Sequence, residues 1–209
     1  MKKLVDLKVK SFLDEVASES PAPGGGSVAA LAGALGAALS AMVCNLTLNK
    51  EKFASVHDEI EEVLERCEHT RERLTDIIDK DTEAFNKVID AIKLPKDTEE
   101  EQKKRKKELQ KALKGAALVP LETARLCAEV IELSKVVAQK GNQNSITDAA
   151  SSAIIAEAGF RAAILNVKIN LASIKDKKFV EEISYEIEMI EKNVEDGIKE
   201  VMDIVGSRV

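Results

Sequence analysis

The chain has 209 residues, 44% of them hydrophobic and 33% charged, which is enough for one globular domain, 1–209, with a sizeable core. Its formal net charge of −6 argues against a nucleic-acid-binding protein, because a phosphate backbone favours basic surfaces. Three widely spaced cysteines and no apolar signal-peptide segment argue against a disulfide framework and favour the cytoplasm.

The N-terminal region predicts a helix followed by a tight loop. Residues 3–18 have apolar side chains at helical spacing, and the helix ends before Pro21 because a residue preceding proline disfavours the α conformation. Residues 21–27 read Pro-Ala-Pro-Gly-Gly-Gly-Ser, a composition that suits neither a helix interior nor a strand. We expect Ser27 to cap the next helix, and the bare glycine amides to admit a flat or anionic ligand.

An apolar run of small residues, 28–46, follows this loop. Its length approaches that of a membrane span. We favour a buried core helix over a membrane helix, because the run contains Ser40 and Asn45 and lacks an aromatic belt. Its alanines and glycines recur at three- and four-residue spacing, which lets a second helix approach closely.

Residues 51–93 show a heptad pattern of apolar positions with charges on the other faces, which predicts a long helix. A straight helix of this length measures about 65 Å. A compact chain of this size is only about 43 Å across. The sequence therefore predicts either an elongated molecule or a helix that bends or breaks near His69 and Thr70.

Asp81 occupies an apolar position of this heptad pattern. A carboxyl group among aliphatic side chains loses hydration, so its pKa rises and it can serve as a general acid or base near neutral pH. The structural alternative is a salt bridge to a lysine or arginine of a facing helix. Asp79 points about 200° away around the helix and is expected to be solvated.

The second half of the chain predicts three more helical segments. Asp97 or Thr98 is expected to cap a helix that stops at Lys140–Gly141, with Pro120 kinking or dividing it. The basic run 103–107 predicts a solvated face more readily than a binding site. The polar loop 142–148 leads into a small, apolar helix, 149–171, and an amphipathic helix covers about 177–205.

Asn166 and Asn170 interrupt the apolar segment four residues apart, hence on one face of the helix. Buried amides need partners, so these two either join helices or read the polar edge of a heterocyclic ligand. Asp148 is interpreted first as a helix N-cap. Without strand or hairpin signals, the fold prediction is all-α, with seven to nine long antiparallel helices around the small-residue helix. His57 and His69 lack metal-ligand spacing.

Several segments together resemble one known family. Residues 20–27 followed by the alanine- and glycine-rich helix look like the cyclodeaminase domain of formiminotransferase-cyclodeaminase, whose family includes stand-alone methenyltetrahydrofolate cyclohydrolases. Residues 79–85 resemble its Asp-x-Asp-x-Glu-Ala-Phe stretch. Four further segments agree in order and spacing: Leu94-Pro95-Lys96, Val119-Pro120-Leu121, Gly141-Asn142 with Asp148, and residues 166–171.

The resemblance implies an all-helical homodimer that binds polyglutamylated tetrahydrofolate as substrate, and it implies no metal or prosthetic group. It implies that Asp81 or Asp79 is the catalytic acid or base, and the heptad pattern favours Asp81. The substrate-binding residues expected with it are Pro23, Gly24, Gly25, Gly26, Ser27, Asp79, Asn142, Asp148, Asn166 and Asn170.

Three functions remain open on the sequence. The favoured one is a cyclodeaminase that converts 5-formiminotetrahydrofolate to 5,10-methenyltetrahydrofolate and ammonia. The second is a methenyltetrahydrofolate cyclohydrolase, since both reactions need a proton carrier beside the same bridging carbon. The third is a non-catalytic helical dimer module, with no nucleic-acid or membrane partner in any of the three.

Overall fold

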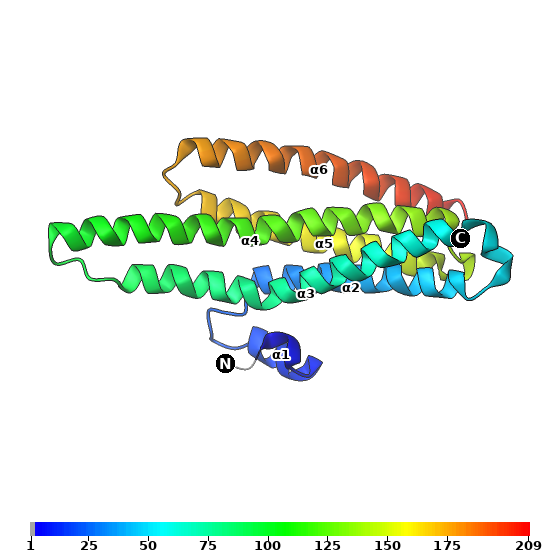
Figure 1. The fold of residues 1–209 in the computed structure, drawn as a ribbon, viewed down its shortest axis with the longest axis horizontal. Helices are drawn as coiled ribbons and strands as arrows, with labels where there is room; N and C mark the ends of the chain where they lie inside the picture. Colours follow the sequence, from blue (N-terminus) through cyan, green and yellow to red (C-terminus); the bar gives the residue numbers. More distant parts are fainter. Residues whose placement is uncertain (1–2) are drawn as a thin grey trace.

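The computed structural model describes residues 3–209, which contain helices and no strand, so the all-α prediction is confirmed (Figure 1). The α-helices are α1 (Val9–Val16), α2 (Gly25–Leu48), α3 (His57–Lys93), α4 (Glu99–Lys140), α5 (Ile146–Leu171) and α6 (Lys177–Gly206). Short 3-10 helices cover Leu4–Asp6, Glu51–Val56 and Gln143–Ser145. Among the described residues, the six α-helices are fewer than the seven to nine expected, and the total is nine only when the three 3-10 helices are included.

Helix α2 lies at the centre of the bundle and packs against α3, α4 and α5. Small residues permit this packing: a β-carbon on Gly159 of α5 would lie 2.8 Å from the carbonyl oxygen of Ala29 on α2. By length and composition alone, α2 and residues 143–171 could each cross a membrane. However, 61% of the apolar 18-residue stretch of α2 is buried inside the bundle. This burial agrees with the expected core helix.

Helices α3 and α4 are long and continuous, about 56 Å and 63 Å at the usual rise per residue, and the molecule is elongated (Figure 1). The alternative of a break near His69 is therefore wrong. Pro120 also lies inside α4 without dividing it. Proline cannot donate to the carbonyl group four residues earlier, and here the Asn170 side-chain amide donates to that oxygen, on Ala116, at 3.1 Å.

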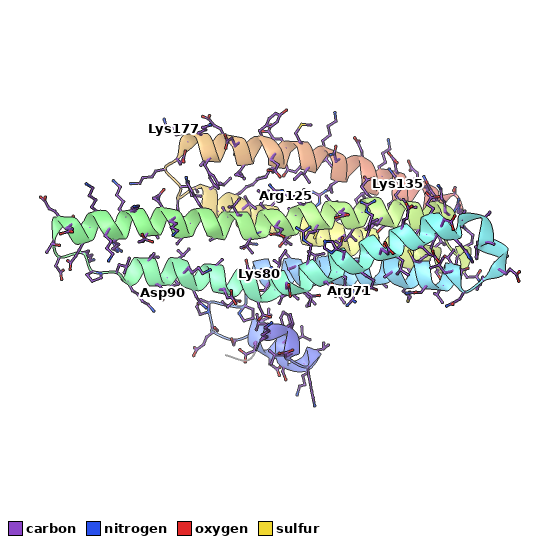
Figure 2. The ribbon with its side chains drawn as sticks, in the orientation of Figure 1. Arg71, Lys80, Asp90, Arg125, Lys135 and Lys177 are labelled. Carbon is purple, nitrogen blue, oxygen red and sulfur yellow. The ribbon has the colours of Figure 1, made fainter. Side chains whose placement is uncertain are left out.

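Local end signals fix the limits of the later helices. Thr98 caps α4 in a capping box with Glu101, and α4 ends at Lys140 before Gly141, as predicted. Helix α6 joins the bundle through apolar contacts and through ion pairs such as Arg125–Glu186, on the α4 face labelled in Figure 2.

The α3–α4 hairpin projects past the start of α2 at one end of the molecule (Figure 1). We call residues 84–113 of this hairpin the α3–α4 arm. On the flank of α3 near the base of the arm, the expected helix 3–18 is divided into the 3-10 turn Leu4–Asp6 and α1. The amide of Leu4 donates to the Asp79 carboxylate at 2.7 Å.

Candidate active site

The carboxyl group of Asp81 faces the first turn of α2. The Ser27 hydroxyl donates to the carbonyl oxygen of Ile78 at 2.8 Å and lies 3.3 Å from Oδ2 of Asp81. Thr82 adds a second hydroxyl, 3.4 Å from that of Ser27. Within residues 3–209 Asp81 forms no ion pair, so the interhelical salt bridge considered from the sequence is absent there.

Partial burial raises the pKa of Asp81 above its ordinary value, while hydrogen bonds from the Ser27 side chain and backbone act in the opposite direction. Burial is the larger cause. The raised pKa brings the protonated carboxyl closer to neutral pH, where it can exchange a proton with a neighbouring ligand.

The glycine loop lets the carboxyl group approach the α2 backbone. A β-carbon on Gly26 would overlap the Asp81 carboxyl group, so only glycine leaves this space free. Gly24 is the N-cap of α2 and no side chain caps the helix, so the expectation that Ser27 caps it is wrong. Ser27 instead lies in the first turn, where its hydroxyl bonds to α3. Pro23 is buried just before this turn.

The two asparagines of α5 join this site. A β-carbon on Gly25 would lie 3.2 Å from Nδ2 of Asn166. The side-chain amide of Asn166 donates to Ala162, and that of Asn170 donates to the Asn166 and Ala116 carbonyl oxygens. The side-chain NH2 groups of both asparagines therefore donate to backbone carbonyl oxygens. No hydrogen bond within residues 3–209 involves their Oδ1 atoms. The ligand-binding role expected for the two residues stays a prediction.

The structure places Asn142 and Asp148 at the other end of the bundle. The backbone amide of Asn142 donates to Thr47 of α2 at 2.8 Å, and its own side chain accepts from Asn144. Thr47 is twenty residues beyond Ser27, or about 30 Å along the helix. Asp148 lies in the first turn of α5 and is not its N-cap, which is Ser145. Within one subunit these residues do not meet Asp81, and their binding role stays a prediction.

Asp79 is half-buried rather than solvated, because its carboxylate accepts the hydrogen bond from the Leu4 amide. This contact holds the N-terminal segment against α3. Its expected role in substrate binding stays a prediction. Within the described part of the chain, 3–209, no three His, Cys, Asp or Glu side chains are grouped as metal ligands.

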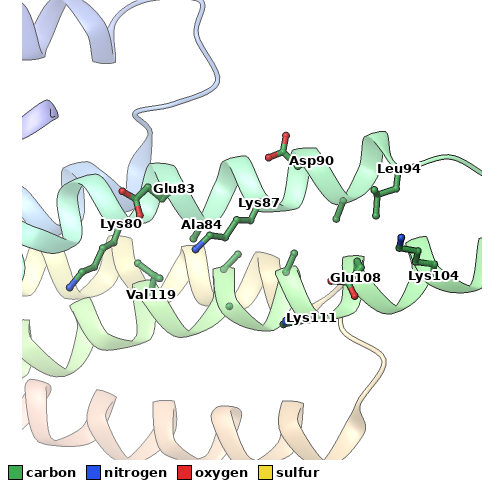
Figure 3. Close-up of a pocket in the computed structure, with 14 residues that line it drawn as sticks. Lys80, Glu83, Ala84, Lys87, Asp90, Leu94, Lys104, Glu108, Lys111 and Val119 are labelled. Carbon is green, nitrogen blue, oxygen red and sulfur yellow. The ribbon is translucent and has the colours of Figure 1, made fainter. Parts of the chain in front are cut away.

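A cleft of about 710 Å³ opens between α3 and α4 next to this site (Figure 3). Lys80, Glu83 and Ala84, which flank Asp81 in the sequence, line its inner end, together with Ala116, the acceptor of the Asn170 amide. Three of the segments that carry the family resemblance supply lining residues: Lys80, Glu83 and Ala84 from 79–85, Leu94 from 94–96, and Val119 from 119–121. Lys104 from the basic run lines the outer end.

Comparisons with known proteins agree with this arrangement. The family model described as formiminotransferase-cyclodeaminase matches residues 8–189. A protein of Methylorubrum extorquens named methenyltetrahydrofolate cyclohydrolase is 48% identical over 86% of each chain. The rat formimidoyltransferase-cyclodeaminase is 36% identical over 88% of this chain, which spans only 34% of that longer protein.

A solved structure has the same fold. The crystal structure of formiminotetrahydrofolate cyclodeaminase from Thermotoga maritima superimposes with a TM-score of 0.89 and 35% identity, and covers 98% of both chains. The sequence-based family resemblance is therefore confirmed. The chain belongs to the formiminotransferase-cyclodeaminase family of folate-processing enzymes.

Proposed function

We propose that the protein is a methenyltetrahydrofolate cyclohydrolase, which converts 5,10-methenyltetrahydrofolate and water to 10-formyltetrahydrofolate. The observation that carries the chemistry is the half-buried Asp81 carboxyl group against the first turn of α2, with its pKa raised by burial. The choice between the two folate reactions is supported by the 48% identity to a cyclohydrolase of similar length. It reverses the preference drawn from the sequence alone.

In this reaction Asp81 moves one proton. Its carboxylate takes a proton from the water that attacks the methenyl carbon. The carboxyl group then gives this proton to N5 as the bond between that carbon and N5 breaks. The remaining hydroxyl proton goes to solvent as the formyl group forms, which balances the loss of the substrate's positive charge.

Cyclodeamination of 5-formiminotetrahydrofolate is the second candidate, supported by the matching Thermotoga maritima structure. N10 attacks the formimino carbon, and its proton passes through Asp81 to the formimino nitrogen. After this relay Asp81 is a carboxylate again, so it takes up a second proton from solvent and gives it to the amino group. The amine leaves readily as ammonia only after this protonation. The five-membered methenyl ring remains.

A paired assay on the purified protein tests both reactions. The proposal expects loss of methenyltetrahydrofolate absorbance without ammonia release from formiminotetrahydrofolate. Ammonia release with little hydrolysis favours the second candidate. If the protein has neither activity, the folate-enzyme proposal is refuted and the helical dimer module remains.

Asp81→Asn should lower kcat by about 10²–10⁴-fold with an unchanged circular dichroism spectrum. Asp79→Asn should be milder, and Asp76→Asn, exposed on the same helix, serves as the matched control.

A homodimer is part of this proposal. Helix α2 contains no charged residue, yet Val28, Leu35 and Met42 are exposed on it at seven-residue spacing. On α5, Leu165 and Ile169 are 68% and 70% exposed. Apolar faces of this kind suit a second copy of the chain, which presents the same uncharged surface. Light scattering should give twice the chain mass for the wild type and a lower mass for Leu35→Glu.

A further inference from the structure

We propose that the cleft of the α3–α4 arm binds the aminobenzoyl-glutamate tail of the folate substrate, with Lys87 and Lys111 contacting its carboxylates. The proposal rests on the folate function proposed above and adds residues that determine which folates bind. It follows from four features of the cleft: its position, its lining, its charges and its length.

The cleft begins where the chemistry of the candidate site lies. Ala84 is three residues after Asp81 on α3, and Ala116 on α4 accepts the Asn170 amide. Asp81 itself does not line the cleft, but Lys80, Glu83 and Ala84 on either side of it in the sequence do. A ligand whose reactive atoms lie beside Asp81 can therefore extend outward between α3 and α4. The cleft volume of about 710 Å³ is that of a site for a small organic molecule.

The floor of the cleft is small and apolar. Residues on both helices leave space for a flat ring: Ala84, Ala91, Ala112, Gly115 and Ala116. A β-carbon on Gly115 would meet nothing within 4 Å, so this glycine is not required by packing inside the subunit. A benzoyl ring removes apolar surface from water when it enters such a slot.

The rim carries cations without intramolecular partners. Lys87 and Lys111 form no ion pair within residues 3–209. Figure 3 shows Lys87 extending from α3 toward α4, whereas the carboxyl group of Asp90 points to the opposite side of α3. Glu83 and Glu108 also line the cleft, so four lysines outnumber three acids there. The cleft therefore offers one unpaired ammonium group from each of its two helices, which favours a ligand with carboxylates.

The spacing fits the tail of one glutamate. Lys87 is six residues beyond Asp81, about 9 Å along α3 at the usual rise. In an extended folate, N10 lies about 9 Å from the α-carboxylate at ordinary bond lengths. Lys111 is five residues from Ala116 on α4, a similar depth on the facing helix. Lys104 is seven residues farther out, beyond the reach of a single glutamate.

Calorimetric titration of the full-length protein tests the proposal with two stable probes, 5-formyltetrahydrofolate and the same compound without glutamate, 5-formyltetrahydropteroate. The wild type should bind the first at least about 10-fold more tightly, as two partly solvated charge-assisted hydrogen bonds allow. Lys87→Ala and Lys111→Ala should each remove most of this ratio and leave the affinity for the pteroate unchanged. Lys104→Ala, and Lys107→Ala outside the cleft, should behave as the wild type.

Equal affinity of the wild type for the two probes overturns the proposal. So does a loss of affinity in the lysine variants that is the same for both probes, because it indicates a general structural change. Turnover separates this inference from the proposed function. Tail-dependent binding without catalysis refutes the function and supports the cleft, whereas catalysis with no tail preference does the reverse. In an active enzyme, the two variants should raise KM and leave kcat within about twofold.

Discussion

The carboxyl group of Asp81 fills the space that a side chain at Gly26 would occupy. The two residues are 55 positions apart in the chain, and this contact joins the α2 glycine turn to the α3 acid. A β-carbon at residue 26 would overlap this carboxyl group, so the carboxyl group has to move if residue 26 is enlarged.

Gly26→Ala should lower kcat at least about 10-fold and cost little stability. The new methyl group overlaps the end of the Asp81 side chain, which can rotate away more cheaply than backbone can shift. The displaced carboxyl group then loses its position beside Ser27. Steady-state kinetics and urea unfolding check both parts. Gly206→Ala, at the end of α6, is the control, because a β-carbon there would meet nothing within 4 Å. A fully active Gly26→Ala variant would contradict the assigned role of Asp81.

Asp81 should also make stability depend on pH in a definite direction. Folding raises its pKa, so the folded state binds the proton more tightly than the unfolded state. The stability contributed by this proton is complete below the unfolded-state pKa and is lost as pH rises through the folded-state pKa. The amide of the Asp81→Asn variant has no proton to lose. The unfolding free energy of this variant minus that of the wild type should therefore increase as pH rises across this interval.

Urea unfolding of both proteins from pH 4 to pH 8 measures this difference, in which the titration of all other groups largely cancels. A difference that falls with rising pH would mean that the Ser27 hydrogen bonds outweigh burial and that Asp81 is held as a carboxylate.

The helix limits set by local chemistry were predictable from the sequence. Thr98 with Glu101 starts α4 and Gly141 ends it, because the groups that satisfy the helix ends lie within four residues of them. Asp81 was also identified correctly as a partly buried acid, since the heptad pattern records which face of α3 meets the bundle.

Features that depend on distant partners were not predictable. Pro120 should have disturbed α4, but Asn170, fifty residues later, supplies the missing donor. Serine is a favourable residue type for an N-cap, but α3 lies close enough for the Ser27 hydroxyl to bond to Ile78 instead. The cleft depends on the distance between the facing sides of α3 and α4. The heptad pattern indicates which side of a helix is buried, but not how far that side lies from the next helix.

Three serines form a buried hydrogen-bonded cluster that links α2, α4 and α5. Ser152 donates to the carbonyl oxygen of Gly36 at 2.6 Å and lies 2.8 Å from the hydroxyls of both Ser40 and Ser134. Ser152→Ala should lower the unfolding free energy by about 1–3 kcal/mol, because it removes three hydrogen bonds between buried groups. Ser151→Ala, exposed on the next position, should change it by less than about 0.5 kcal/mol. Equal effects in urea unfolding would show that the cluster adds no specific stability.

Thr70 presents the opposite case in the middle of α3. The residue is fully buried, and its hydroxyl is the one buried side-chain polar atom in residues 3–209 without a hydrogen-bond partner. Thr70→Val replaces that hydroxyl by a methyl group of similar size, so the desolvation cost disappears and the shape is kept. The variant should be more stable by about 1 kcal/mol, a rise in Tm of about 2–4 °C for a chain of this length. Calorimetry of the two proteins checks this prediction, with Thr75→Val as the control. The Thr75 hydroxyl donates to the Arg71 carbonyl oxygen, so its replacement should not raise Tm. A lower Tm for Thr70→Val would indicate that the hydroxyl has a partner in solution, such as an ordered water.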